Sequence, residues 1–95
     1  MKQLAVALKE HLASNNGKIS PSFIQSVANT ANVIYQQVTP SMRICVLQLP
    51  SGHEVYGVAQ VLDPKNDVEA IGNAVAYKNA VEELWKVCGN IAKIL

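Results

Sequence analysis

Two segments near the start of the chain place apolar residues at helical spacing. Residues 2–13 carry Leu4, Leu8 and Leu12 on one face, which predicts an amphipathic helix. Ser20 can cap a second helix, and Pro21 suits its first position because proline has no N–H to leave unpaired. The apolar face of this second helix is formed by Phe23, Ile24, Val27 and Ala28.

The middle of the chain is rich in β-branched and aromatic residues. Residues 33–38, 43–49 and 53–61 are predicted strands, separated by the turn segments Thr39-Pro40-Ser41 and Pro50-Ser51-Gly52. Three consecutive strands with short connections favour an antiparallel meander.

The segment 62–88 has the longest helical periodicity in the chain. Asn66 or Asp67 can cap a helix there, and Gly89 is expected to end or kink it. The sequence therefore predicts a small single α+β domain over residues 1–95, in which two N-terminal helices precede a three-stranded antiparallel sheet. The long C-terminal helix is predicted to pack on that sheet.

Small residues indicate where this helix meets the sheet. If Ser51-Gly52 is a two-residue turn, Val46 pairs with Gly57, and Ile44 pairs with Ala59 on the same face. The low relief at Gly57 and Ala59 matches a row of small residues on the helix, formed by Gly72, Ala76 and Ala80. A bulky residue at Gly57 or Ala76 is then expected to cost about 1–3 kcal/mol through overpacking.

The opposite sheet face would carry Arg43, Cys45, Leu47 and Leu49, and its centre is apolar. Such a face needs a cover. The N-terminal helix is one candidate, and a second subunit is another, with a ligand held between subunits as a variant. A one-residue bulge at the turn would exchange the two faces.

Composition narrows the class of partner. Of the 95 residues 49% are apolar and 16% charged, and the net charge is +1. The apolar excess favours a homo-oligomer, and the near-neutral charge argues against general nucleic-acid binding. No apolar run is long enough for a membrane span, so a cytoplasmic protein is expected.

Residue types that carry catalysis are scattered. The adjacent Glu82 and Glu83 diverge on a helix, and His11 and His53 stand apart from other ligand-type residues. Cys45 and Cys88 are interpreted as reduced core thiols. We expect no catalytic residues, no metal site and no cofactor, and therefore no enzyme.

Binding chemistry is better represented. Arg43, Lys78 and the helix entrance at Asn66 could each meet an anion. Tyr35, Tyr56 and His53 could stack on a flat ring. Each of these residues has a surface or packing role as its alternative.

From about residue 19 to 95 the sequence resembles a family of small proteins of tailed phages and prophages. The resemblance is carried by the turn segment 46–52, Val55-Tyr56-Gly57, the segment 62–66, Ile71-Gly72, the segment 76–80 and Trp85. Ser51 stands where the family pattern has an Asn, and Val58-Ala59 replaces a more polar pair. Residues 1–18 lie outside the match as an N-terminal helical extension.

The resemblance implies a phage accessory protein made in the host cytoplasm and acting against host defence. The leading hypothesis is a homo-oligomer that sequesters a nucleotide-type immune signal, such as a cyclic dinucleotide, without catalysis. This extends by analogy from other small phage proteins. The alternatives are a protein that inhibits a host enzyme through an apolar sheet face and, third, a hydrolase of such a signal.

Overall fold

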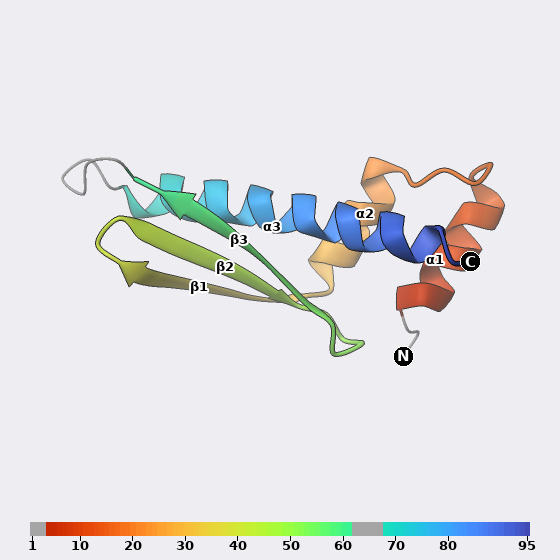
Figure 1. Cartoon of the computed structure of the whole chain (residues 1–95), viewed down its shortest axis with the longest axis horizontal. Coiled ribbons are helices and arrows are strands. Elements are labelled where there is room, and N and C mark those ends of the chain that lie inside the picture. The colour runs from red at the N-terminus through yellow and green to blue at the C-terminus, as the bar shows by residue number, and fades with distance from the viewer. Residues whose placement is uncertain (1–3, 62–67) are drawn as a thin grey trace.

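Helices and strands follow one another in the predicted order. The computed structural model describes residues 4–61 and 68–95. Two helices precede an antiparallel sheet of strand order β1-β2-β3, and a long helix follows it (Figure 1). The elements are α1 (Leu4–Ser14), α2 (Pro21–Asn29), β1 (Asn32–Thr39), β2 (Met42–Gln48), β3 (Glu54–Gln60) and α3 (Glu69–Ala92). The predicted α+β fold is confirmed.

Local signals account for the start of α2. The Ser20 hydroxyl accepts a hydrogen bond from the Phe23 N–H at 3.1 Å, and Pro21 is the first residue of the helix. The cap satisfies one of the N–H groups that a helix start leaves without a partner. The predicted cap is therefore confirmed.

The two ends of α3 differ from the predicted ones. Val68 occupies the N-cap position and makes no side-chain cap. Asn66 and Asp67, the expected caps, lie outside the described residues. The helix continues through Gly89 to Ala92, so an end at Gly89 is wrong, and the alternative of a kink there stays a prediction. Packing of the last turns, including the buried Cys88, outweighs the modest helix propensity cost of one glycine.

The β2–β3 register is shifted by one residue from the predicted one. Cys45 pairs with Gly57, and Arg43 with Ala59, instead of Val46 and Ile44. The Leu49 N–H donates to the His53 carbonyl at 2.8 Å, and the Gly52 N–H to the Leu49 carbonyl at 2.9 Å. The loop thus has three residues, Pro50 to Gly52, and Gly52 takes a φ of 91° that suits glycine.

This shift exchanges the two faces of the sheet. Cys45, Leu47 and Leu49 lie on the face that α3 covers, and Cys45 and Leu47 are fully buried. The prediction that this face is covered by α1 or a second subunit is wrong, because α3 is the cover. The opposite face, with Ile44, Val46 and Tyr56, is left without a helix (Figure 1).

The predicted contact between the helix and the small residues is confirmed despite the shift. A Cβ added at Gly57 would lie 2.2 Å from the Ala80 nitrogen and 2.3 Å from the Ala76 oxygen. Gly72, Ala76, Ala80, Leu84 and Cys88 form the buried stripe of α3. The helix backbone therefore lies directly on the strand at Gly57.

The core continues past the sheet to the N-terminal helices. Leu4 and Leu8 of α1 and Ile24 and Ala28 of α2 are buried in the same cluster as Leu84 and Cys88. In Figure 1, α1 and α2 lie beside the C-terminal half of α3, away from the β1–β2 turn. The molecule is elongated, with principal extents of 49 × 23 × 19 Å. No helix among residues 4–61 and 68–95 is long and apolar enough to cross a membrane.

Candidate functional site

Two of the six predicted ligand residues share a surface beside α3. Tyr35 of β1 pairs with Cys45, and Gln37 pairs with Arg43, so all four side chains lie on the helix side of the sheet. Tyr35 and Arg43 are therefore diagonal neighbours on adjacent strands, about 7–8 Å apart between Cα atoms. The helix packs on β3 and β2, whereas every residue of β1 is exposed. We call this surface the β1 shelf, and it consists of Val33, Tyr35, Gln37, Arg43 and Tyr77.

Tyr77 forms the wall of the β1 shelf on the α3 side. Its hydroxyl accepts a hydrogen bond from Gln25 Nε2 of α2 at 3.0 Å, which links the ring to that helix. Burial raises the pKa of the Tyr35 hydroxyl, and the neighbouring Cys45 and Tyr77 raise that pKa further. Two phenol rings and a guanidinium thus border one open surface, a set that suits a flat ring bearing negative charge.

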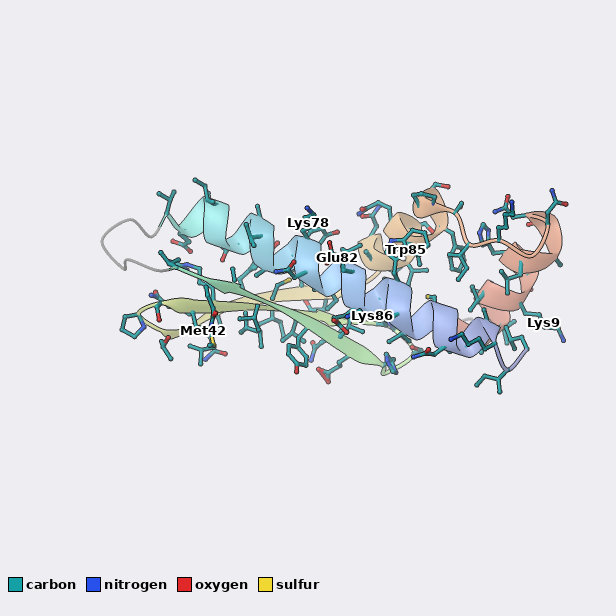
Figure 2. All side chains as sticks on the ribbon, turned by 45° about the horizontal axis from the view of Figure 1, so that its top comes forward. Lys9, Met42, Lys78, Glu82, Trp85 and Lys86 are labelled. Atoms are coloured by element: carbon teal, nitrogen blue, oxygen red, sulfur yellow. The ribbon has the colours of Figure 1, made fainter. Side chains whose placement is uncertain are left out.

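The other predicted residues lie elsewhere. Tyr56 is 60% exposed and lies on the opposite sheet face, and His53 is exposed in the β2–β3 turn. Lys78 is exposed on α3 and projects away from the sheet (Figure 2). Asn66 lies outside the described residues. The six residues therefore do not form one site in a single copy of the chain.

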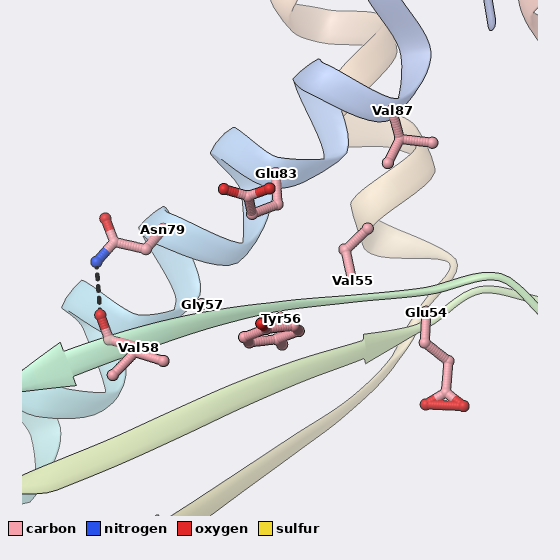
Figure 3. A pocket seen from close by; sticks show the side chains of 8 residues that line it. All are labelled: Glu54, Val55, Tyr56, Gly57, Val58, Asn79, Glu83 and Val87. Carbon is pink, nitrogen blue, oxygen red and sulfur yellow. Dashed lines mark hydrogen bonds between the residues drawn. The ribbon is translucent and has the colours of Figure 1, made fainter. Parts of the chain in front are cut away.

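A groove of about 390 Å³ runs between the outer edge of β3 and α3 (Figure 3). Asn79 Nδ2 donates a hydrogen bond of 2.8 Å to the Val58 carbonyl at one end of the groove. Glu54 and Glu83 also line the groove, and Glu83 Oε1 forms an ion pair with Lys86 Nζ at 2.9 Å. Hydrogen bonding to Glu83 raises the pKa of the Lys86 ammonium. Two carboxylates make this groove unfavourable for phosphate.

Asn79 is a residue whose role the sequence interpretation missed. It stands three residues after Ala76, in the segment of α3 that crosses Gly57. The sequence held one signal for this role. Asn79 is a polar residue next to the row of small residues that contacts an edge strand. Its amide satisfies a carbonyl that the edge would otherwise leave without a partner.

A second hollow, of about 410 Å³, is apolar. It lies between the two N-terminal helices and the β2–β3 turn, and its lining includes Leu4, Phe23, Val27 and Leu49. It offers no charged group for an anion. Of these three surfaces, the β1 shelf combines aromatic rings with a cation.

The reactive residue types are built into the packing. Cys45 and Cys88 are fully buried, and burial raises the pKa of both thiols, which keeps them neutral. His11 stacks on Phe23 with ring centroids 4.3 Å apart, and its Nε2 accepts the Ser20 N–H at 3.1 Å. Within residues 4–61 and 68–95 no three His, Cys, Asp or Glu side chains gather as they would around a metal ion.

Comparison with protein families identifies a match over most of the chain. The model of a family described as phage protein (N4 Gp49/phage Sf6 gene 66) matches residues 16–94, which covers the sheet, α2 and α3. The helix α1 precedes the matched residues. No curated protein and no solved structure matches the chain.

Proposed function

Because the chain belongs to the phage N4 Gp49/Sf6 gene 66 family, we propose that it is a phage accessory protein that sequesters a nucleotide-type host immune signal. A cyclic dinucleotide is the ligand class that we favour. The protein would bind it as a homo-oligomer, without catalysis, in the host cytoplasm. Removal of the signal by binding alone would keep a host defence enzyme inactive.

The β1 shelf is the observation that supports this proposal. Tyr35 and Tyr77 offer ring faces on which a base can stack, and Arg43 can pair with a phosphate. The shelf is open on the side of the β1 edge because every residue of β1 is exposed. The proposal needs no chemical step, and neutral buried thiols and a stacked histidine are consistent with that.

Isothermal titration with cyclic dinucleotides and ADP-ribose derivatives tests the proposal. We expect Tyr35→Ala and Arg43→Gln each to weaken binding about ten-fold or more, because one stacked base or one charge pair contributes roughly 1–3 kcal/mol. Tyr56→Ala and Lys78→Ala are the matched controls, since both residues lie outside the shelf, and they are expected to change affinity less than two-fold. The absence of heat with every compound of the panel would refute sequestration of this ligand class.

A second function is favoured by the uncovered sheet face. Ile34, Ile44, Val46 and Tyr56 lie on this face, and Tyr56 is 60% exposed. An apolar face of this kind suits a protein inhibitor of a host enzyme. Affinity purification from host lysate distinguishes the two: an inhibitor retains one host protein in stoichiometric amount and loses it after Tyr56→Asp. A sequestering protein retains no such partner.

A further inference from the structure

Strand β1 is an edge strand without the usual protection. All eight of its residues are exposed, and none of them carries a charge. Val33 and Ile34 are each 38% exposed, and Tyr35 is 44% exposed. Edge strands normally carry charges, prolines or a covering element, because an open edge pairs with other strands.

The backbone of β1 presents hydrogen-bonding groups to the outside. The Leu49–His53 and Ser41–Val61 hydrogen bonds show that the odd-numbered residues of β2 bond to β3. The even-numbered residues of β2 therefore bond to β1, at the pairs Ile34–Val46 and Gln36–Ile44. The N–H and C=O groups of Val33, Tyr35 and Gln37 consequently point away from the sheet. Within residues 4–61 and 68–95, no backbone hydrogen bond joins these groups to a turn, a loop or another element.

The other edge of the sheet is different. At β3 the helix α3 lies against the strand, and the Asn79 amide donates a hydrogen bond to the outward-pointing carbonyl of Val58. Glu54 adds a charge near one end of β3, and Glu83 adds another from the helix. The β3 edge therefore has one occupied carbonyl and charged side chains beside it, whereas the β1 edge has neither, which favours β1 as the interaction surface.

We propose that a second copy of this chain pairs with β1 in antiparallel fashion about a two-fold axis, which gives a continuous six-stranded sheet. A second copy is the occupant that fits, because the strand is complementary to itself: it has no charge to oppose its own copy, and apolar side chains on both faces. The regular part of the strand ends at the bulge between Gln37 and Thr39. The axis therefore passes through Tyr35 or Ile34.

Such pairing completes the β1 shelf. The shelves of the two copies join across the axis into one trough, with Tyr35 from each copy on its floor and an α3 helix along each side. A two-fold symmetric ligand such as a cyclic dinucleotide matches this symmetry. The inference rests on the proposed function only for the ligand; the pairing itself is tested without one.

Sedimentation velocity measures the pairing. An interface made of one strand edge is small, so we expect a wild-type dimer with a Kd between about 1 µM and 0.5 mM. Tyr35→Lys places a charge on the open edge and is expected to raise this Kd about ten-fold or more. Tyr56→Lys is the control, because it puts the same change on the exposed opposite face at β3. A wild type that stays monomeric, or a dimer that Tyr35→Lys leaves intact, overturns the proposal.

Disulfide cross-linking locates the axis in folded protein. Either Tyr35→Cys or Ile34→Cys is expected to form an intermolecular disulfide, because residues on the axis face each other with Cα atoms about 4.5–5.5 Å apart. Cys45 lies opposite Tyr35 on β2, so Tyr35→Cys is made in a Cys45→Ala background, whereas the buried Cys88 stays in place. Tyr56→Cys should form no intermolecular disulfide, and failure of both β1 variants to cross-link contradicts the pairing. A cross-linked dimer that binds no nucleotide refutes the proposed function alone, whereas a monomer that binds one refutes the pairing alone.

Discussion

Gly57 determines how closely α3 approaches the sheet. A Cβ at this position would lie 2.2–2.6 Å from backbone atoms of Ala76, Asn79 and Ala80. We expect Gly57→Ala to lower the free energy of unfolding by about 3 kcal/mol, because only a shift of the whole helix relieves a clash with backbone. The melting temperature should fall by at least about 10 °C in a thermal scan by circular dichroism.

Gly89→Ala is the matched control on the same helix. A Cβ at Gly89 meets no atom within 4 Å, and the residue lies inside α3. The substitution should stabilise the protein by about 0.5–1 kcal/mol through helix propensity. Equal melting temperatures for Gly57→Ala and the wild type would contradict the observed helix contact.

The buried thiols predict a loss of stability at alkaline pH. Burial raises the pKa of Cys88 above the ordinary value of 9.0, so the folded state keeps its proton where the unfolded state loses it. The stability contributed by the neutral thiol is therefore complete below pH 9.0 and declines as the pH rises from there toward the folded pKa. The decline is up to about 1.4 kcal/mol per pH unit for each thiol.

Urea unfolding with a reducing agent at several pH values between 7.5 and 10 measures this decline. Cys88→Val retains a buried apolar side chain without the ionisable group, so its stability should fall less steeply with pH than that of the wild type. An identical slope in the variant would show that Cys88 does not contribute to the pH dependence.

At the scale of elements, the N-terminal helices meet through one polar and aromatic contact. His11 of α1 stacks on Phe23 of α2 and accepts the Ser20 N–H, beside the buried Leu8. We expect His11→Ala to reduce the free energy of unfolding by about 1–2 kcal/mol, because both the ring contact and the acceptor are lost. Chemical denaturation measures the change. Lys9→Ala, at an exposed neighbouring position, should stay within about 0.5 kcal/mol, and an equal effect of the two would contradict the contact.

The order of the elements was predicted correctly, whereas the predicted register of the β2–β3 hairpin was wrong. Apolar periodicity and the Ser20-Pro21 cap were sufficient for the helices. In the hairpin, Pro50 fits the second position of a type I turn and leaves Gly52 for the left-handed residue, a three-residue loop instead of two. One residue in loop length exchanges every side chain between the faces.

The β1 shelf was only partly predictable for a related reason. Val33, Ile34 and Tyr35 are consecutive apolar residues, so β1 has no alternation from which its two faces can be assigned. Tyr35 and Arg43 were therefore candidates without a known spatial relation. Tyr77 was interpreted as a packing residue, and its bond to Gln25 depends on the packing of α2, which lies 52 residues away in sequence.

At the scale of the whole molecule, the chain places one helix, α3, on one face of a sheet of only three strands. Ile44 and Val46 on the other side are half-buried by their neighbours, while β1 is exposed at the margin. A domain of this size buries a modest fraction of its surface, so association adds stability that the monomer lacks. Pairing at the open edge of β1 would thus increase the stability of the fold as well as complete the ligand-binding surface.

A concentration dependence of the melting temperature follows from this relation. If only folded chains pair through β1, mass action stabilises the folded state, by about 2.7 kcal/mol when the concentration exceeds the Kd a hundred-fold. For a domain of this length that corresponds to a rise in melting temperature of roughly 10–20 °C. Differential scanning fluorimetry across a hundred-fold concentration range should show the rise in the wild type and in Tyr56→Lys. Tyr35→Lys should show a smaller rise over the same range, because its Kd is higher. A wild-type melting temperature that does not change with concentration would mean that folding and pairing are not coupled, and that the three-stranded sheet is stable with its β1 edge open.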